Sequence, residues 1–181
     1  ITMKIRPKNL FLVASLICLT ACKDSPKNKE QLTTEAPVAS TVDFDLNKAI
    51  ADCEAQLEIS VPKLTDLTKH PRLIEAGDTE WEQIPNGRLV WTSGFYPGIL
   101  WYMYGLDHEK KWEEEAIKRT EVFEEYKDIT EHHDIGFMMF PAFGLGYEIG
   151  GMKEYKDILL TSAASLATRY NPNVGTIRSW S

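Results

Sequence analysis

Cysteine is scarce in this sequence, with three residues in a chain of 181. Cys18 and Cys22 fall in an apolar N-terminal segment, and Cys53 stands alone on the apolar face of a predicted helix. No zinc-type cysteine spacing is present, and the three residues do not make a disulfide framework. The sequence therefore excludes a disulfide scaffold and a cysteine-ligated zinc site, and we expect Cys53 to fill core space.

The sequence also lacks a basic stripe interleaved with aromatic residues. It has 27 acidic and 20 basic residues, with a net charge of -7. Loss of the leader predicted below removes Lys4, Arg6 and Lys8 and brings the net charge to -10. Because an acidic surface repels phosphate backbones, nucleic acid is not an expected partner. An anionic sugar would need a local site that overcomes this overall field.

Long hydrophobic runs are absent apart from residues 10–19, which are too short to span a bilayer comfortably. This run follows a basic stretch and ends in Leu19-Thr20-Ala21-Cys22, the pattern of a bacterial lipoprotein signal peptide. We expect residues 1–22 to be that signal, with Cys22 lipidated. The protein would then be anchored in the cell envelope, on the periplasmic face or surface of a Gram-negative outer membrane. The alternative is an ordinary secretory signal with an incidental cysteine.

Residues 23–41 are mostly polar and offer little to a core, which predicts a flexible tether. Residues 42–181 should fold, and their apolar periodicity predicts five helices. The first helix has the apolar stripe Leu46, Ile50, Cys53 and Leu57 and ends at Pro62, and the second is the apolar run 99–104, after Gly94. The third has the stripe Trp112, Ala116, Thr120 and Phe123, and the fourth is the apolar run 135–143, kinked or interrupted by Pro141. The fifth has the stripe Tyr155, Ile158, Leu159, Ser162, Leu166 and Tyr170. No β-alternation of any length is present, although residues 176–180 could form a short extended segment.

The second and fourth of these helices are apolar on nearly all sides, whereas the third and fifth have one polar face. A helix that is apolar all round must be surrounded by protein, and a half-polar helix lies against it from outside. This alternation predicts an all-α fold, an (α/α)6-barrel or toroid. The chain supplies about five of about twelve helices of such a barrel, so we expect it to be incomplete. A simple helical bundle is the alternative.

His132-His133-Asp134 directly precedes the fourth predicted helix. If that helix is an inner one, Asp134 could point into a central cavity and act on a ligand. It could instead be a helix N-cap, a role that aspartate fills well, with both histidines facing solvent. A metal site is less favoured, because adjacent histidines point in different directions and no HExxH-like spacing is present.

The stretch from Trp91 to Gly98, which reads Trp-Thr-Ser-Gly-Phe-Tyr-Pro-Gly, places aromatic rings and glycines at the start of the other inner helix. Rings there could stack on sugar faces, and glycines would admit close backbone approach. Core packing is the alternative role for these rings. Trp180, shortly after Arg178, could reach the same cavity or be a buried strand residue.

These two segments and a third, Ile177-Arg178-Ser179-Trp180, resemble in this order glycoside hydrolase family 88, the unsaturated glucuronyl hydrolases. The resemblance covers roughly residues 44–181, and the His-His-Asp sequence is its most specific element. The unsaturated rhamnogalacturonyl hydrolases of family 105 share the barrel and are the near alternative, but the double histidine favours family 88.

The resemblance implies an enzyme that acts on unsaturated uronic-acid oligosaccharides left by polysaccharide lyases. A carboxyl group would protonate C4 of the vinyl ether at the non-reducing end, and water would add at C5. The resulting hemiketal would open and expel the sugar, and no metal or organic cofactor is required. The competing hypothesis from another class is a non-catalytic sugar-binding lipoprotein, for which aromatic platforms suffice.

The resemblance also implies roles for individual residues. Asp134 corresponds to the first of two essential aspartates, which holds ring hydroxyls and supports the transition state. His133 corresponds to a substrate-contacting histidine, and Trp91 and Trp180 to aromatic residues of the sugar subsite. The second aspartate, the general acid and base, would follow beyond Ser181, so we expect the complete protein to be active and this chain alone to be inactive.

Overall fold

The structure is a computed structural model that describes residues 44–179. The predicted signal peptide, the lipidation site Cys22, the tether and Trp180 lie outside the described residues. The helices are α1 (Leu46–Ser60), α2 (Phe95–Asp107), α3 (Lys110–Glu121), α4 (Ile135–Met139), the π-helix η3 (Phe140–Gly144), α5 (Leu145–Glu148) and α6 (Tyr155–Ala167), with 3-10 turns η1 (Trp91–Gly94) and η2 (Glu124–Tyr126). The strands are β1 (Lys69–Leu73), β2 (Glu82–Pro85), β3 (Tyr170–Asn171) and β4 (Thr176–Ile177).

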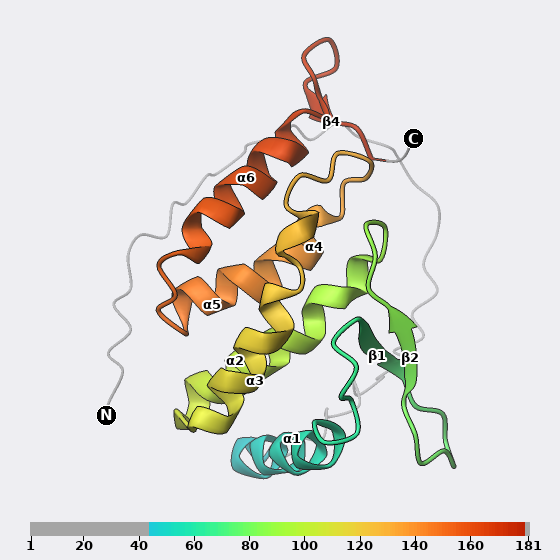
Figure 1. Cartoon of the computed structure of the whole chain (residues 1–181), viewed down its shortest axis with the longest axis vertical. Helices are drawn as coiled ribbons and strands as arrows, with labels where there is room; N and C mark the ends of the chain where they lie inside the picture. Colours follow the sequence, from blue (N-terminus) through green and yellow to red (C-terminus); the bar gives the residue numbers. More distant parts are fainter. Residues whose placement is uncertain (1–43, 180–181) are drawn as a thin grey trace, which may run out of the picture. The chain divides into compact units, whose positions relative to one another are not determined.

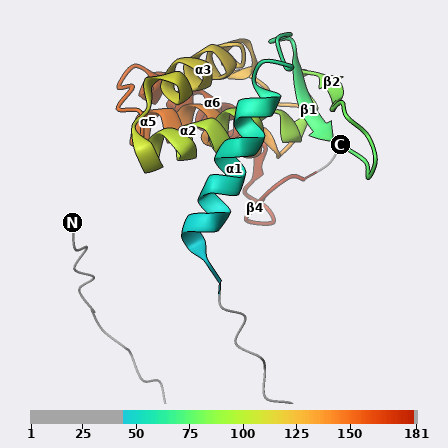
Figure 2. The ribbon, with the colours of Figure 1, turned by 90° about the horizontal axis from the view of Figure 1, so that it is seen from below.

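The helices pack in the alternation that the sequence predicts (Figure 1). The apolar helix α2 lies against α3 and η3, and α6 packs on η3 and α4. Figure 2 shows α1 crossing one side of this group. The two apolar helices are therefore neighbours, each with an amphipathic helix against it, which is the inner and outer arrangement expected of an α/α toroid.

The fourth predicted helix runs from Ile135 to Glu148 in three consecutive segments, α4, η3 and α5. Pro141 is the second residue of η3, where a proline has no N–H for the α-helical ladder and its ring crowds the preceding turn. A π-turn absorbs this conflict without ending the helix. The disturbance expected at Pro141 therefore takes the form of a π-turn and does not end the helix.

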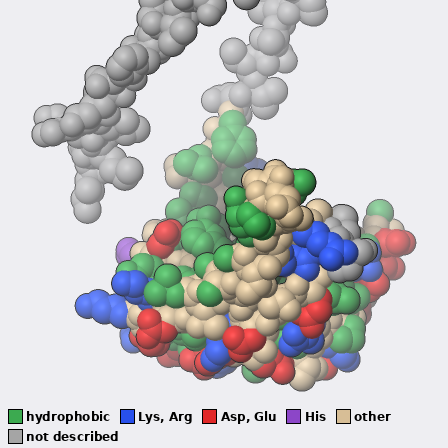
Figure 3. Space-filling view, turned by 90° about the horizontal axis from the view of Figure 1, so that it is seen from above, with side chains coloured by type: hydrophobic (Ala, Val, Ile, Leu, Met, Phe, Trp, Pro, Cys, Tyr) green, Lys and Arg blue, Asp and Glu red, His purple; other side chains and the backbone are tan. Residues whose placement is uncertain are grey.

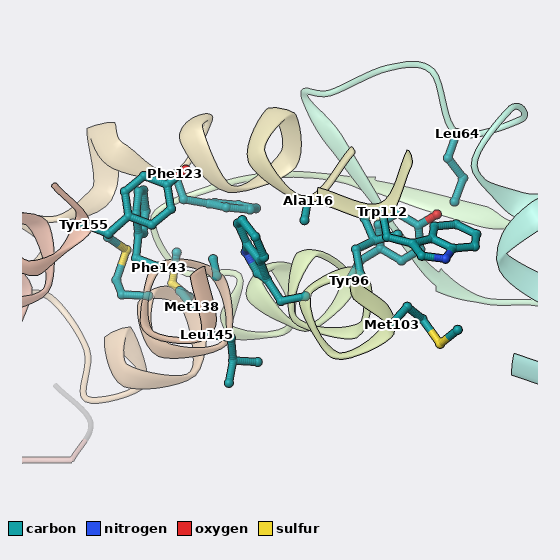
Figure 4. Close-up of a cluster of buried hydrophobic side chains, with 14 of the residues drawn as sticks. Leu64, Tyr96, Met103, Trp112, Ala116, Phe123, Met138, Phe143, Leu145 and Tyr155 are labelled. Carbon is teal, nitrogen blue, oxygen red and sulfur yellow. The ribbon is translucent and has the colours of Figure 1, made fainter. Parts of the chain in front are cut away.

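The core fills the space between these helices (Figure 4). It includes the predicted stripe of α3, whose residues are buried against aromatic and methionine side chains of the inner helices. The indole Nε1 of Trp101 donates to Oγ1 of Thr120 at 3.0 Å, so the largest ring of the core has its polar atom satisfied.

One face of each inner helix is nevertheless open to solvent within the described residues. On α2 the exposed apolar side chains recur at helical spacing, and α4 and η3 add further exposed rings. These side chains are Phe95, Ile99, Tyr102, Leu106, Phe137 and Phe140. The expectation that both inner helices are covered on all sides is therefore met on only part of their circumference. No helix among residues 44–179 is long and apolar enough to cross a membrane.

Two sequence expectations about α1 and α6 are wrong. Cys53 is exposed, because α1 contributes chiefly the C-terminal part of its stripe, such as Leu57, to the described core. The stripe of the fifth helix does not continue to Tyr170, because α6 ends at Ala167 and Tyr170 begins the short antiparallel hairpin β3–β4. The extended segment expected near residue 176 corresponds in part to β4.

The antiparallel hairpin β1–β2 was not predicted, and it fastens the loop before α2 through a buried histidine. His70 donates from Nδ1 to Oδ1 of Asn86 at 2.9 Å and accepts at Nε2 from Oγ1 of Thr92 at 3.0 Å. Asn86 Nδ2 in turn donates to the carbonyl of Leu67 at 2.9 Å, which leaves its Oδ1 for the histidine. This network holds the 3-10 turn η1 against the hairpin.

We expect the stability of the fold to fall below about pH 6.5 because of His70. Burial lowers the pKa of His70 below its ordinary value, so the unfolded chain takes up a proton in a window where the folded chain does not. The free energy of unfolding therefore decreases as the pH falls through the unfolded pKa towards the folded one. Melting temperatures at about pH 7.5 and about pH 5.5 should show this loss, and His70→Gln should reduce it. Equal losses in both proteins would contradict the assignment.

Candidate active site

The two aromatic and histidine segments that the sequence analysis singled out meet in space. Gly94 ends η1 and lies directly against the backbone of α4, where an added Cβ would stand 2.6 Å from the carbonyl oxygen of Phe137. A glycine is therefore required for this close approach. It brings the start of α2 against the start of α4, as expected for two inner helices.

Three rings cover the junction on the solvent side. Trp91 lies edge-on to Phe95 and to Phe137, with centroid separations of 5.8 Å and 5.9 Å. Phe95 and Phe137 are 6.2 Å apart, so the rings form one cluster, which we call the aromatic platform. Trp91 is 47% exposed and the other two are also solvent-accessible. Trp91 is therefore not packed into the core of the described residues, and exposed rings of this kind can stack on a sugar face.

Asp134 occupies the N-cap position of α4, but its side chain makes no capping hydrogen bond. It is only 7% exposed, and its Oδ1 lies 3.0 Å from Nε2 of His133. The carboxylate of Asp134 therefore does not cap the helix, although that was one of the two roles considered for it from the sequence. A buried carboxylate turned away from the backbone amides and paired with an imidazole is a candidate functional group.

His132 is buried, which contradicts the alternative that both histidines face solvent. Its Nδ1 accepts from the backbone N–H of Asp134 at 3.2 Å, so its proton is on Nε2, which donates to the carbonyl of Arg88 at 2.6 Å. This neutral tautomer leaves no ion pair with the Asp134 carboxylate, whose nearest oxygen is 3.8 Å from Nδ1. His132 is therefore a structural residue that orients the backbone of Asp134.

His133 is partly exposed and lies between Asp134 and the segment after β4. Its Nδ1 is 3.1 Å from the backbone carbonyl of Ser179 and 3.3 Å from the Ser179 hydroxyl. Ser179 lies 46 residues along the chain, in the third segment of the family resemblance, but its contact with His133 was not predicted. The predicted site residues Asp134 and His133 are thus in direct contact, and Trp91 belongs to the platform at the start of the same helix junction.

The metal alternative finds no support at the two histidines. Within residues 44–179, the one group of three ligand-type residues close enough together to hold an ion is Glu54, Asp107 and Glu109. The ammonium group of Lys111 lies 3.5 Å from Glu54 and 2.7 Å from Glu109, so a lysine already neutralises part of this cluster. The cluster includes neither His132 nor His133.

No family model matches the chain. The chain is 40% identical over 174 residues to an unsaturated glucuronyl hydrolase of Formosa agariphila, and this match covers 94% of the chain and 40% of that protein. It is also similar to the crystal structure of an unsaturated glucuronyl hydrolase specific for heparin, with 31% identity and a TM-score of 0.65 over 74% of this chain and 35% of that one. The corresponding enzyme of Bacillus sp. GL1 gives 25% identity and a TM-score of 0.64 over 75% and 35%.

These similarities confirm the resemblance and the toroidal fold expected from the sequence. The helices that the structure describes are part of an α/α toroid and do not close a barrel. The chain spans 40% of the length of the curated relative described above. Trp180 lies outside the described residues, and the roles of the individual site residues remain predictions.

Proposed function

Because this chain belongs to the unsaturated glucuronyl hydrolase family, we propose that the complete protein is a glycoside hydrolase of family 88 with the activity of that family. It would release 4,5-unsaturated uronic acid from the non-reducing end of oligosaccharides that polysaccharide lyases produce. The observation that carries this proposal is the buried, non-capping carboxylate of Asp134, paired with His133 beside the aromatic platform.

The chemistry of the substrate explains why such a site suits it. The unsaturated ring contains a vinyl ether, which is protonated at C4 while water adds at C5. The hemiketal formed at C5 opens the ring, and the remaining sugar leaves from C1. Positive charge develops at C5 and the ring oxygen, so a fixed carboxylate beside the ring stabilises the transition state.

Each predicted residue takes one part of this task. Asp134 holds ring hydroxyls and the developing charge, His133 contacts the substrate, and Trp91 stacks on the sugar face, with Trp180 expected in the same subsite. We expect proton transfer to C4 to belong to a second carboxyl group, which the resemblance implies further along the complete protein than Trp180. The proposed reaction needs no metal or organic cofactor.

Substrates of the relatives guide the choice of oligosaccharide. One similar enzyme is specific for heparin, and the Bacillus sp. GL1 enzyme is responsible for degradation of glycosaminoglycan. We propose unsaturated disaccharides from a uronate polymer as the substrate class.

The test uses the complete protein and a pair of disaccharides that differ only in the C4–C5 double bond. The unsaturated disaccharide should lose its ultraviolet absorbance and release its reducing-end sugar, whereas the saturated one should persist. Binding of either sugar without turnover would favour a non-catalytic sugar-binding lipoprotein. Turnover restricted to unsaturated rhamnogalacturonides would favour the family 105 activity.

We also propose that the protein works at a membrane, through a lipid on Cys22. The support is the sequence alone: a basic start, the apolar run and the Leu19-Thr20-Ala21-Cys22 motif. Cys22→Ser should move the protein from the membrane to the soluble fraction, because it removes the cysteine that would carry the anchoring acyl chains. Fractionation and labelling with a palmitate analogue would measure this, with Cys53→Ser as the control. Unchanged membrane recovery of Cys22→Ser would contradict lipidation at that residue.

A further inference from the structure

Arg169, two residues after the end of α6, connects the β3–β4 hairpin to the candidate site. Its side chain donates to three backbone carbonyls: Nε to Arg178 at 2.9 Å, Nη1 to Thr130 at 2.6 Å and Nη2 to Ser179 at 2.6 Å. The backbone N–H of Arg178 donates back to the carbonyl of Arg169 at 2.9 Å. The guanidinium group thus fastens the segment after β4 to the loop that leads into His132-His133-Asp134.

Figure 3 looks onto the end of the molecule that carries this hairpin, and Lys and Arg side chains gather beside it. A groove of about 480 Å³ lies there, lined by Arg169 together with Thr130, Asn171 and Arg178. Three carbonyls in different directions need a planar fork of several N–H donors, which arginine has and lysine does not. The arrangement therefore specifies arginine at position 169.

The carbonyl of Ser179 accepts a second hydrogen bond, from Nδ1 of His133 at 3.1 Å. A carbonyl oxygen has two lone pairs and no proton to give, so Nδ1 must carry the proton of this bond. Arg169 Nη2 and His133 Nδ1 then donate to the two lone pairs of the Ser179 carbonyl oxygen. Arg169 therefore holds in place the carbonyl that keeps the proton of His133 on Nδ1.

With Nδ1 protonated, the geometry leaves Nε2 of His133 facing Oδ1 of Asp134 at 3.0 Å. The hydrogen bond from Nδ1 to the Ser179 carbonyl thus fixes the orientation of the imidazole ring and turns its second nitrogen towards Asp134, the residue that the proposed function places at the sugar hydroxyls.

We infer that Arg169 is a positioning residue of the site: through the carbonyl of Ser179 it keeps the proton on Nδ1 of His133 and turns Nε2 of that ring towards Asp134. The inference rests on the proposed function only for its effect on turnover. The hydrogen-bonding part stands on this geometry alone, and it is tested without a substrate.

The test is 15N NMR of the complete protein labelled at histidine, with the His133 signals assigned by their loss in His133→Gln. The parent protein should show a protonated Nδ1 in slow exchange with water. Arg169→Ala and Arg169→Lys should both lose this signature and show an exchanging imidazole. Ser179→Ala keeps the carbonyl and should leave the His133 spectrum unchanged, as should Arg72→Ala, an exposed arginine on β1.

The outcomes separate positioning from general stabilisation. A lowered melting temperature in Arg169→Lys with an unchanged His133 spectrum would make Arg169 a structural residue only and overturn the inference. A Ser179→Ala spectrum like that of Arg169→Ala would show that the hydroxyl is the partner, which also overturns it. If Arg169→Ala fails to fold, Arg169→Lys, which keeps the charge and most of the side chain, decides the question.

Turnover provides a second readout. In the complete protein, Arg169→Lys should lower kcat by about 10²-fold, as expected for a misplaced catalytic group, with little change in KM. Unchanged kcat would contradict the role in positioning. If the parent protein does not turn over unsaturated disaccharides but its His133 spectrum depends on Arg169, the proposed function fails and the inference stands.

Discussion

Asp134→Asn in the complete protein should lower kcat on an unsaturated uronyl disaccharide by about 10²–10⁴-fold, the range typical of a lost acid-base or charged catalytic group. Asparagine has the same shape and can keep the contact with His133, but it carries no charge to stabilise the transition state. The melting temperature should hardly change, because the carboxylate makes no capping bond and asparagine caps about as well as aspartate.

The control is Asp157→Asn, which removes an exposed aspartate from the first turn of α6. Its kcat should match that of the parent protein. Thermal unfolding of both variants must accompany the kinetics, because a fold defect would lower kcat for an unrelated reason. An unchanged kcat in Asp134→Asn would exclude Asp134 from the chemistry and leave its contact with His133 as a structural feature.

Gly94→Ala should destabilise the protein by about 3 kcal/mol or more, at or above the upper end of the usual cost of overpacking. The backbone of Gly94 has φ -74°, an ordinary value for any residue, so alanine meets no local strain there. The cost comes from the added Cβ, which would clash with the carbonyl of Met138 and lie 2.6 Å from that of Phe137. These are backbone atoms of α4 and cannot rotate away.

Gly136→Ala is the matched control, because it adds the same methyl group within the same helix junction. An added Cβ at Gly136 meets nothing within 4 Å. Inside α4 this change should be neutral or stabilise the protein by up to about 1 kcal/mol, through helix propensity. Chemical denaturation of both variants measures the difference. Equal stabilities would show that α4 can shift away from α2, contrary to the close packing described above.

The helices were predictable because apolar side chains that are buried on one face of a helix recur at helical spacing in the sequence. The stripe of Trp112, Ala116, Thr120 and Phe123 predicted α3, and each of these side chains is buried. Pro141 marked the position of the π-turn because a proline disturbs any helix interior. The β1–β2 hairpin has no such apolar periodicity, since its strands are largely exposed and do not alternate between buried and exposed residues.

Residues of a candidate site could be proposed from the sequence, but the contacts between them could not. Asp134 and His133 were identified from their position before an inner helix and from a family resemblance. Whether Asp134 caps that helix could not be decided, because the choice depends on the direction of one side chain. The carbonyl of Ser179 approaches His133 from a distant part of the chain, and the side chain of Arg169 contacts that carbonyl. Apolar periodicity predicts which side chains of one helix or strand are buried. It does not predict which backbone atom from a distant part of the chain contacts a given side chain.

The most direct test of the central claim is a crystal structure of the complete Asp134→Asn protein with an unsaturated uronyl disaccharide. The unsaturated ring should lie against Trp91, with its hydroxyls within hydrogen-bond reach of residue 134 and His133. A disaccharide bound elsewhere, with residue 134 and the aromatic platform empty, would contradict the proposed function of this site.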